Sequence, residues 1–202
     1  MKLIQNKYKG VVFFGEQGSG KSTAAGILSK VIDNSELMEA SLVLKFALSL
    51  KKLPKTKDQF IESVDDSHKD DPIDREKTRN IFPILTQKYS RTIVAESMNA
   101  LVDKKFTDKF VIIAGARALD AAKFYKLNNF LVVYLECLDW DLVERLKGRR
   151  KAEKEVKEEL RHEEEIYQTT EIKNIADLVL DSSKLSPKEI SDTLLDFLTL
   201  WC

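Results

Sequence analysis

The chain has 202 residues, 43% of them hydrophobic, and its 33 basic and 33 acidic residues give a formal net charge of zero. These values predict a domain with a sizeable core and argue against a dedicated nucleic-acid or anionic-membrane surface. No apolar run approaches the roughly 18 residues of a membrane span. The polar N-terminus and two unpaired cysteines, Cys137 and Cys202, predict a reduced, cytoplasmic protein.

The first predicted strand and helix flank a glycine-rich loop. Residues 10–14 are an apolar run of β-forming residues, and residues 22–32 have helical spacing. The glycines let the backbone direct its N–H groups at phosphate oxygens, and the helix dipole adds to their effect. We expect Lys21 to reach the β- and γ-phosphates of a nucleotide and the Ser22 hydroxyl to bind Mg²⁺. The complete P-loop and its next residue comprise Gly15, Gln17, Gly18, Ser19, Gly20, Lys21, Ser22 and Thr23.

A second strand is expected over residues 36–41, followed by helical patterns over 42–53 and 75–104, the latter broken by Pro83. Residues 54–74 are polar and read as a loop on the side where a phosphate acceptor would dock. Its aspartate pairs at 65–66 and 70–71 could bind a metal, but the spacing places no third ligand, so a solvated acidic loop is favoured. We assign residues 54–104 to an acceptor-binding helical insertion.

The third predicted strand, residues 110–114, leads through Gly115 and Ala116 into Arg117. Residues just past the carboxyl ends of parallel strands face the ligand crevice. An arginine there can bind an acceptor phosphate through two parallel hydrogen bonds. Arg79 and Arg91 lie on the preceding helical region and could converge on the same place, although each alone could equally be a surface residue.

A fourth strand over residues 130–135 and a helical pattern over 139–149 precede a basic run that includes Arg145, Arg149 and Arg150. In a kinase, a lid at this place closes arginines over the transferring phosphates and excludes water. The alternative is a basic helix end that complements the helix dipole. A charged helical pattern over 152–167 follows, and we assign residues 145–170 to the lid.

A last strand over residues 177–180 precedes a helix over 187–198, which begins with a capping box of Ser186 and Glu189 around Pro187. Alternating strands and helices predict an α/β fold. We expect a P-loop NTPase three-layer sandwich, in which a parallel sheet of about five strands carries helices on both faces and a helical lid. Residues 1–202 would form a single P-loop kinase domain.

Several segments resemble one group of enzymes. The loop FFGEQGSGKST and the segment LVLKFALSLKK look like those of phage-type deoxynucleoside monophosphate kinases and their cellular relatives. The segments TRNIFPILTQKYSRTIVAESMNALVDKK and FVIIAGARALDAAKFYK are similar to an arginine-containing helix and the next strand of these kinases. The tail NIADLVLDSSKLSPKEI resembles the end of dephospho-CoA kinases. The resemblance covers most of the chain and implies ATP and Mg²⁺ as cofactors, small-molecule nucleotides as partners and a homodimer as one possible assembly.

The resemblance also implies roles for individual residues. Arg145 and Arg149 would be lid arginines. The residues after the last strand, Ser182, Ser183 and Lys184, would lie near the adenine of ATP. The residues that would contact the acceptor nucleotide are Lys45, Lys51, Arg79, Arg91 and Arg117.

One position departs from the pattern of these kinases. Their third strand ends with an acidic residue close before the arginine, whereas this chain has Ala114 and Gly115 there. Glu39, near the end of the second strand, is the favoured substitute, and Glu136 is a second candidate. Three functions therefore stay open: a nucleoside monophosphate kinase, a dephospho-CoA kinase whose acceptor is a ribose hydroxyl, and a nucleotide-binding module that has lost phosphoryl transfer.

Overall fold

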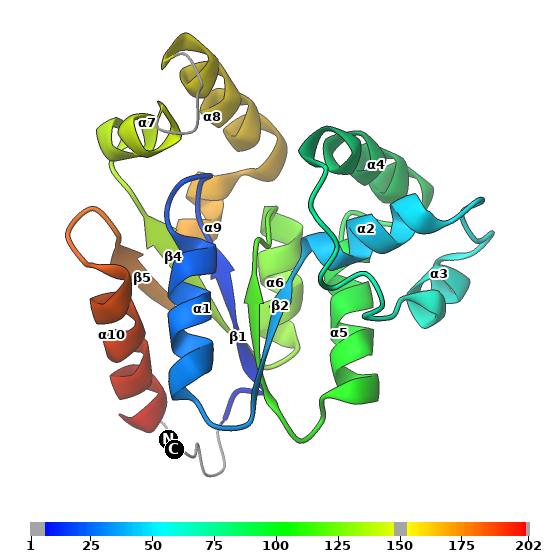
Figure 1. Ribbon diagram of the computed structural model, residues 1–202, viewed down its shortest axis with the longest axis horizontal. Helices are drawn as coiled ribbons and strands as arrows, with labels where there is room; N and C mark the ends of the chain where they lie inside the picture. The colour runs from blue at the N-terminus through cyan, green and yellow to red at the C-terminus, as the bar shows by residue number, and fades with distance from the viewer. Residues whose placement is uncertain (1–6, 148–152, 201–202) are drawn as a thin grey trace.

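A computed structural model of the chain describes residues 7–147 and 153–200 (Figure 1). Its five strands form one parallel sheet in the order β2-β3-β1-β4-β5, with helices on both faces. The predicted α/β fold is confirmed. The strands are β1 (Gly10–Phe14), β2 (Ser35–Glu39), β3 (Phe110–Ala114), β4 (Phe130–Glu136) and β5 (Leu178–Asp181). The helices are α1 (Lys21–Val31), α2 (Ser41–Ser49), α3 (Lys57–Ser63), α4 (Arg75–Lys88), α5 (Ile93–Lys105), α6 (Leu119–Leu127), α7 (Asp139–Lys147), α8 (Glu153–Tyr167), α9 (Thr169–Ile175) and α10 (Pro187–Leu200).

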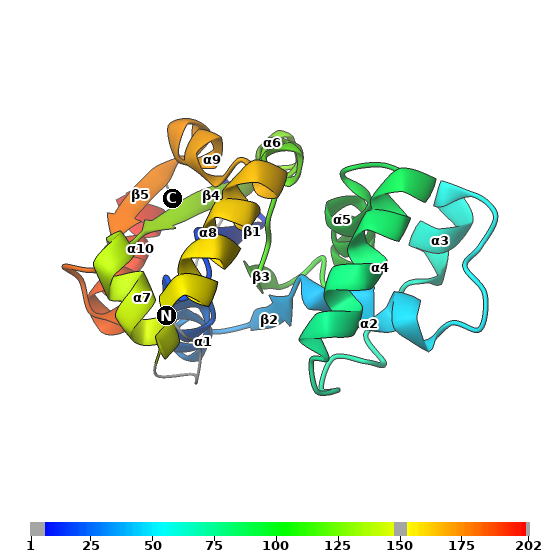
Figure 2. The same cartoon turned by 90° about the horizontal axis from the view of Figure 1, so that it is seen from above.

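Successive residues of the central strand enter two different cores. Val11 and Phe13 pack in one core with residues of α1 and α10, whereas Val12 and Phe14 pack in the other with residues of α2, α5 and α6. Figure 2 shows α6 and α9 on one side of the sheet and α1 and α10 on the other. Because both faces are covered, the strand is apolar at every position, as the sequence pattern indicated. Each fully buried large side chain of this kind stabilises the fold by about 1.5–3 kcal/mol.

The helical pattern over 75–104 does not break at Pro83, so that prediction was wrong. Pro83 lies inside α4, and the chain leaves the helix at Tyr89. Proline has no N–H, so the backbone carbonyl one turn earlier in the helix loses its hydrogen-bond donor. Because Pro83 is exposed, water can reach that carbonyl and take the place of the donor. Tertiary contacts decide the end of the helix, because the Tyr89 hydroxyl donates to the Pro54 carbonyl at 2.7 Å and its ring stacks on Phe60 with centroids 5.1 Å apart.

The segment 54–74, predicted as a polar loop, contains the short helix α3. Thr56 and Gln59 form a capping box at its start, and Phe60 is fully buried. Both signals are readable in the sequence, where Thr and Gln stand three residues apart before an aromatic residue. The prediction also missed α9 and extended the helix of residues 42–53 beyond its end at Ser49.

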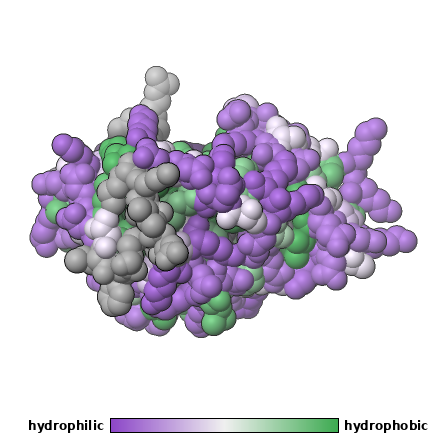
Figure 3. Space-filling view, turned by 90° about the horizontal axis from the view of Figure 1, so that it is seen from below, coloured by the Kyte–Doolittle hydropathy of each residue, from purple (hydrophilic) through white to green (hydrophobic). Residues whose placement is uncertain are grey.

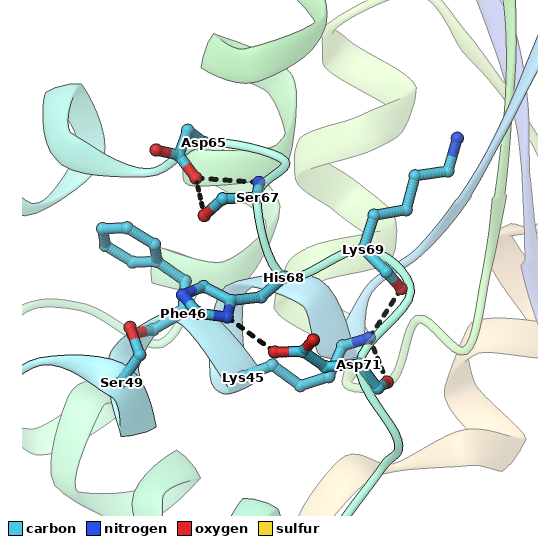
Figure 4. A network of polar contacts seen from close by, with 8 residues as sticks. All are labelled: Lys45, Phe46, Ser49, Asp65, Ser67, His68, Lys69 and Asp71. Atoms are coloured by element: carbon cyan, nitrogen blue, oxygen red, sulfur yellow. Dashed lines mark hydrogen bonds and ion pairs between the residues drawn. The ribbon is translucent and has the colours of Figure 1, made fainter.

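The acidic residues after α3 pair with neighbouring groups (Figure 4). Asp71 Oδ2 lies 2.6 Å from His68 Nδ1, and Asp65 Oδ1 accepts from the Ser67 N–H at 2.9 Å. Asp66 forms an ion pair with Lys105. Within residues 7–147 and 153–200, no group of three or more His, Cys, Asp or Glu side chains could hold a metal by itself.

The remaining helices stand around the edge where the strands end. Helices α7 and α8 lie above this edge, and α2, α3 and α4 form a group beside β2 (Figures 1 and 2). The opposite face, seen from below, carries mostly hydrophilic residues with small, separate hydrophobic areas (Figure 3). In the described part of the chain, no helix has the length and apolar character needed to cross a membrane.

Candidate active site

A cavity of about 280 Å³ lies at the carboxyl-end edge of the sheet, between the P-loop, the ends of β2 and β3, and helices α2, α4, α6 and α8. Among the residues that the structure describes, its lining carries five cationic side chains and one carboxylate, that of Glu39. Because the chain as a whole is neutral, this local excess of positive charge favours an anionic ligand. The cationic side chains are Lys21, Arg75, Arg79, Arg91 and Arg117.

The P-loop has the close backbone approach that a phosphate site requires. Gly15 has φ +134°, and a Cβ there would lie 2.4 Å from the Leu135 carbonyl oxygen. Lys21 is 8% exposed, and its Nζ donates to the carbonyl oxygens of Gly15 and Glu16, both at 2.7 Å. Helix α1 starts at Lys21 with no side-chain cap, which leaves its first N–H groups for a ligand. The loop and helix residues that line the cavity are Gln17, Gly18, Gly20, Lys21, Ser22 and Thr23.

Glu39 lies at the end of β2, beside the end of β3. At the end of β3 this chain has Ala114 and Gly115 in place of the acidic residue of the kinases that it resembles. In the sheet register Glu39 pairs with Ala114, the last residue of β3. A Cβ on Gly115, whose φ is +73°, would lie only 2.8 Å from Glu39 Oε2. The glycine therefore leaves room for the carboxylate of the neighbouring strand. Glu39 and Ser22 line the same cavity, and this pair fits Mg²⁺, which usually takes one or two carboxylates together with waters and substrate phosphates.

Arg117 lies beside an aromatic contact between α8 and α4. Its guanidinium lies 5.6 Å from the centroid of the Tyr167 ring at the end of α8. The Tyr167 ring also meets Phe82 of α4 edge to face, with centroids 5.7 Å apart. A cation over an aromatic face is attracted by the ring quadrupole, so Tyr167 helps to hold the arginine at the cavity wall.

The other predicted arginines differ in their surroundings. Arg79 and Arg91 line the same cavity as Arg117, as the sequence analysis expected of converging arginines. The Arg91 side chain is 85% exposed and lies 3.8 Å from Asp120, so this ion pair constrains it little. Arg75 was not singled out in the sequence, although it stands four residues before Arg79 and thus on the same helical face.

Arg145 lies beside the P-loop on α7. Its Nη1 donates to the Gly18 carbonyl at 3.3 Å, and its Nη2 donates to the Ser182 carbonyl at 2.7 Å. The guanidinium therefore joins the P-loop to the segment after β5. Arg149, the other predicted lid arginine, lies outside the described residues.

Several predicted site residues do not line the cavity. Lys45 donates to the carbonyl oxygens of Lys69 and Asp71, at 2.8 and 2.9 Å, and so holds the loop before α4 (Figure 4). Lys51 is exposed after α2. The Ser183 hydroxyl accepts from the Leu138 N–H at 2.8 Å and links the loops after β4 and β5. Glu136 forms an ion pair with Lys173.

The chain was compared with known proteins. A family model, AAA_18, described as an AAA domain, matches residues 11–168. A search of curated proteins found no match. Among solved structures, the shikimate kinase from Acinetobacter baumannii in complex with shikimate has a TM-score of 0.60 at 13% identity, over 95% of this chain and 93% of that one.

Two further structures are similar over nearly their full length. The shikimate kinase from Aquifex aeolicus has a TM-score of 0.55 at 19% identity, over 98% of this chain and 96% of that one. The protein TT1252 from Thermus thermophilus has a TM-score of 0.60 at 18% identity, over 96% of this chain and 98% of that one. At these identities the likeness establishes the fold, which is the α/β fold of P-loop kinases.

Proposed function

Since the chain belongs to the AAA_18 family of AAA domains, we propose that it transfers a phosphoryl group from ATP to a nucleoside or deoxynucleoside monophosphate. One observation carries the proposal: the P-loop and a cluster of arginines face the same cavity. The P-loop is suited to the donor triphosphate, and the arginines opposite it are suited to an acceptor phosphate. Transfer to a phosphate acceptor needs both phosphates in one positively charged site.

Each group has a distinct task in this reaction. Lys21 and the first N–H groups of α1 bind the donor phosphates, while Ser22 and Glu39 hold Mg²⁺, which neutralises charge on the β- and γ-phosphates when bound. Arg79, Arg91 and Arg117 orient the acceptor. A phosphate acceptor is already ionised at neutral pH and needs no general base.

Glu39 also favours a second candidate, a kinase of the dephospho-CoA type whose acceptor is a hydroxyl. A hydroxyl must lose a proton during transfer, and a carboxylate in the cavity could accept it. The arginine cluster favours the phosphate acceptor, because a hydroxyl needs no such concentration of charge.

The test is ADP formation from ATP and Mg²⁺ with a panel of nucleoside and deoxynucleoside monophosphates, dephospho-CoA, and water alone. We expect at least one monophosphate to raise the rate well above the rate with water. A rise with dephospho-CoA alone would select the hydroxyl acceptor. If ATP binds but no acceptor raises the rate, the protein is a nucleotide-binding module and the proposal is wrong.

Arg117→Ala should raise KM for the acceptor roughly 10- to 100-fold and leave ATP affinity nearly unchanged. The loss corresponds to one charge-assisted hydrogen-bonded contact, made equally in the ground and transition states. The control is Arg161→Ala on α8, whose side chain is 79% exposed and pairs with Glu165. Steady-state kinetics with each substrate varied in turn measure both effects. An equal loss of ATP affinity would assign Arg117 to the donor instead.

A further inference from the structure

Two of the residues that line the cavity carry a buried hydroxyl group without a hydrogen-bond partner. Within the part of the chain that the structure describes, four buried hydroxyls make no hydrogen bond, those of Ser41, Ser97, Tyr125 and Ser191. Ser41 and Tyr125 line the cavity, whereas Ser97 on α5 and Ser191 on α10 do not. Burying a polar group without a hydrogen-bond partner costs free energy. A ligand that supplies the missing partner therefore gains binding free energy.

Tyr125 is 1% exposed, and its ring meets the rings of Phe14 and Phe130 edge to face, with centroids 6.4 and 5.3 Å away. Side chains on a helix point back toward its N-terminus. Ala121 stands one turn earlier on the same face of α6 and also lines the cavity, so this face of the helix borders it. Burial raises the pKa of the Tyr125 hydroxyl, so it remains protonated and can donate.

Ser41 approaches the cavity from another element. It is the first residue of α2 and follows Glu39 by two positions, and no side chain caps the helix. The lining also includes apolar side chains, among them Leu44, Val94, Ala95 and Ala121. The cavity thus offers cations, apolar side chains and two neutral hydrogen-bonding groups.

We propose that Tyr125 and Ser41 determine acceptor specificity by hydrogen-bonding the polar edge of a neutral ring whose phosphate lies on the arginines. The apolar walls would hold the ring faces, and the hydroxyls can each donate and accept at its edge. A nucleobase has this chemistry, whereas a sugar phosphate without a base supplies a phosphate and hydroxyl groups but no flat ring with apolar faces. This inference rests on the proposed function, because it takes the bound molecule to be the phosphoryl acceptor.

The test compares two variants with two matched controls. Tyr125→Phe and Ser41→Ala each remove an unpartnered hydroxyl beside the cavity, and Ser97→Ala and Ser191→Ala each remove one elsewhere. Dissociation constants are measured by calorimetry for a panel of nucleoside monophosphates and for ribose 5-phosphate, which has the phosphate but no base. Thermal unfolding of each variant is measured without ligand.

For the tightest monophosphate, Tyr125→Phe should weaken binding about 2- to 12-fold, the change that one neutral hydrogen bond produces, and Ser41→Ala should weaken it less or equally. Ribose 5-phosphate should bind all variants as it binds the wild type. Tm should stay the same or rise in Tyr125→Phe, because the lost hydroxyl had no partner. Both controls should bind every ligand like the wild type.

Equal monophosphate binding by Tyr125→Phe and the wild type would overturn the inference. It would also be overturned if the wild type bound no monophosphate more tightly than ribose 5-phosphate. Failure of the proposed function looks different: the contrast between monophosphate and ribose 5-phosphate would persist, but the wild type would form no ADP with any acceptor.

Discussion

Lys21→Ala is expected to lower kcat at least about 100-fold, the loss typical when one preorganised group that stabilises transition-state charge is removed. The ammonium of Lys21 already lies inside the P-loop, held by two carbonyl oxygens at 2.7 Å. There it can meet the charge that develops on the transferring phosphoryl group, and no other lysine lines the cavity within the described residues.

The control for this variant is Lys30→Ala. Lys30 lies in the last turn of the same helix and is exposed, so the change removes the same side chain without touching the cavity. ADP formation and circular dichroism are measured for both proteins. If Lys21→Ala folds and retains the wild-type kcat, the P-loop of this chain does not act as a phosphate cradle.

Glu39→Gln should remove most phosphoryl transfer, by about 100-fold or more, while ATP still binds. The variant keeps the size of the side chain but loses the negative charge that, in the proposed reaction, would hold Mg²⁺ and its waters beside Ser22. Glu136→Gln is the matched control, because Glu136 also ends a strand but pairs with Lys173 outside the cavity. ADP formation and ATP affinity are measured for both.

A second variant tests the position of the Glu39 carboxylate without changing its charge. Gly115→Ala places a methyl group 2.8 Å from the unshifted Glu39 Oε2, at a backbone φ of +73°. The carboxylate must move, so we expect transfer to fall at least about tenfold even with Glu39 present, together with a stability loss of about 1–2 kcal/mol from the backbone conformation. Full transfer activity in both Glu39→Gln and Gly115→Ala would show that no acid at this place supports the reaction.

The P-loop region is a part of the structure that short-range sequence patterns predict. The strand, loop and helix around Lys21 all follow from short-range preferences, since apolar β-forming residues, glycines and helical spacing act within about twenty residues. The same holds for the capping box of α10, in which Ser186 and Glu189 bond to each other's N–H groups as expected. Four of the strands were predicted from their apolar runs, because a sheet covered on both faces favours apolar residues at successive positions. The second strand, β2, has the sequence SELME and only one fully buried residue, so its pattern was weaker.

The end of α4 and the existence of α3 depended on contacts between distant residues. Pro83 is a strong local signal, but its exposed place on the helix made it tolerable, and the stacking of Tyr89 on Phe60 ended the helix later. Lys45 resembles a substrate-binding lysine in sequence, yet its ammonium holds a loop carbonyl 24 residues away. No pattern along the chain records such a partner.

The sequence by itself determined the P-loop, the α/β class and most of the basic residues that line the cavity, because these depend on residue type and local spacing. Only the tertiary structure decided which of those residues share a cavity. The sheet register pairs Glu39 with Ala114, so that its carboxylate lies beside Gly115, and the packing of α6 brings Tyr125 to the same cavity as the arginines. Both results depend on how separate elements meet in space, which the packing of the whole core determines.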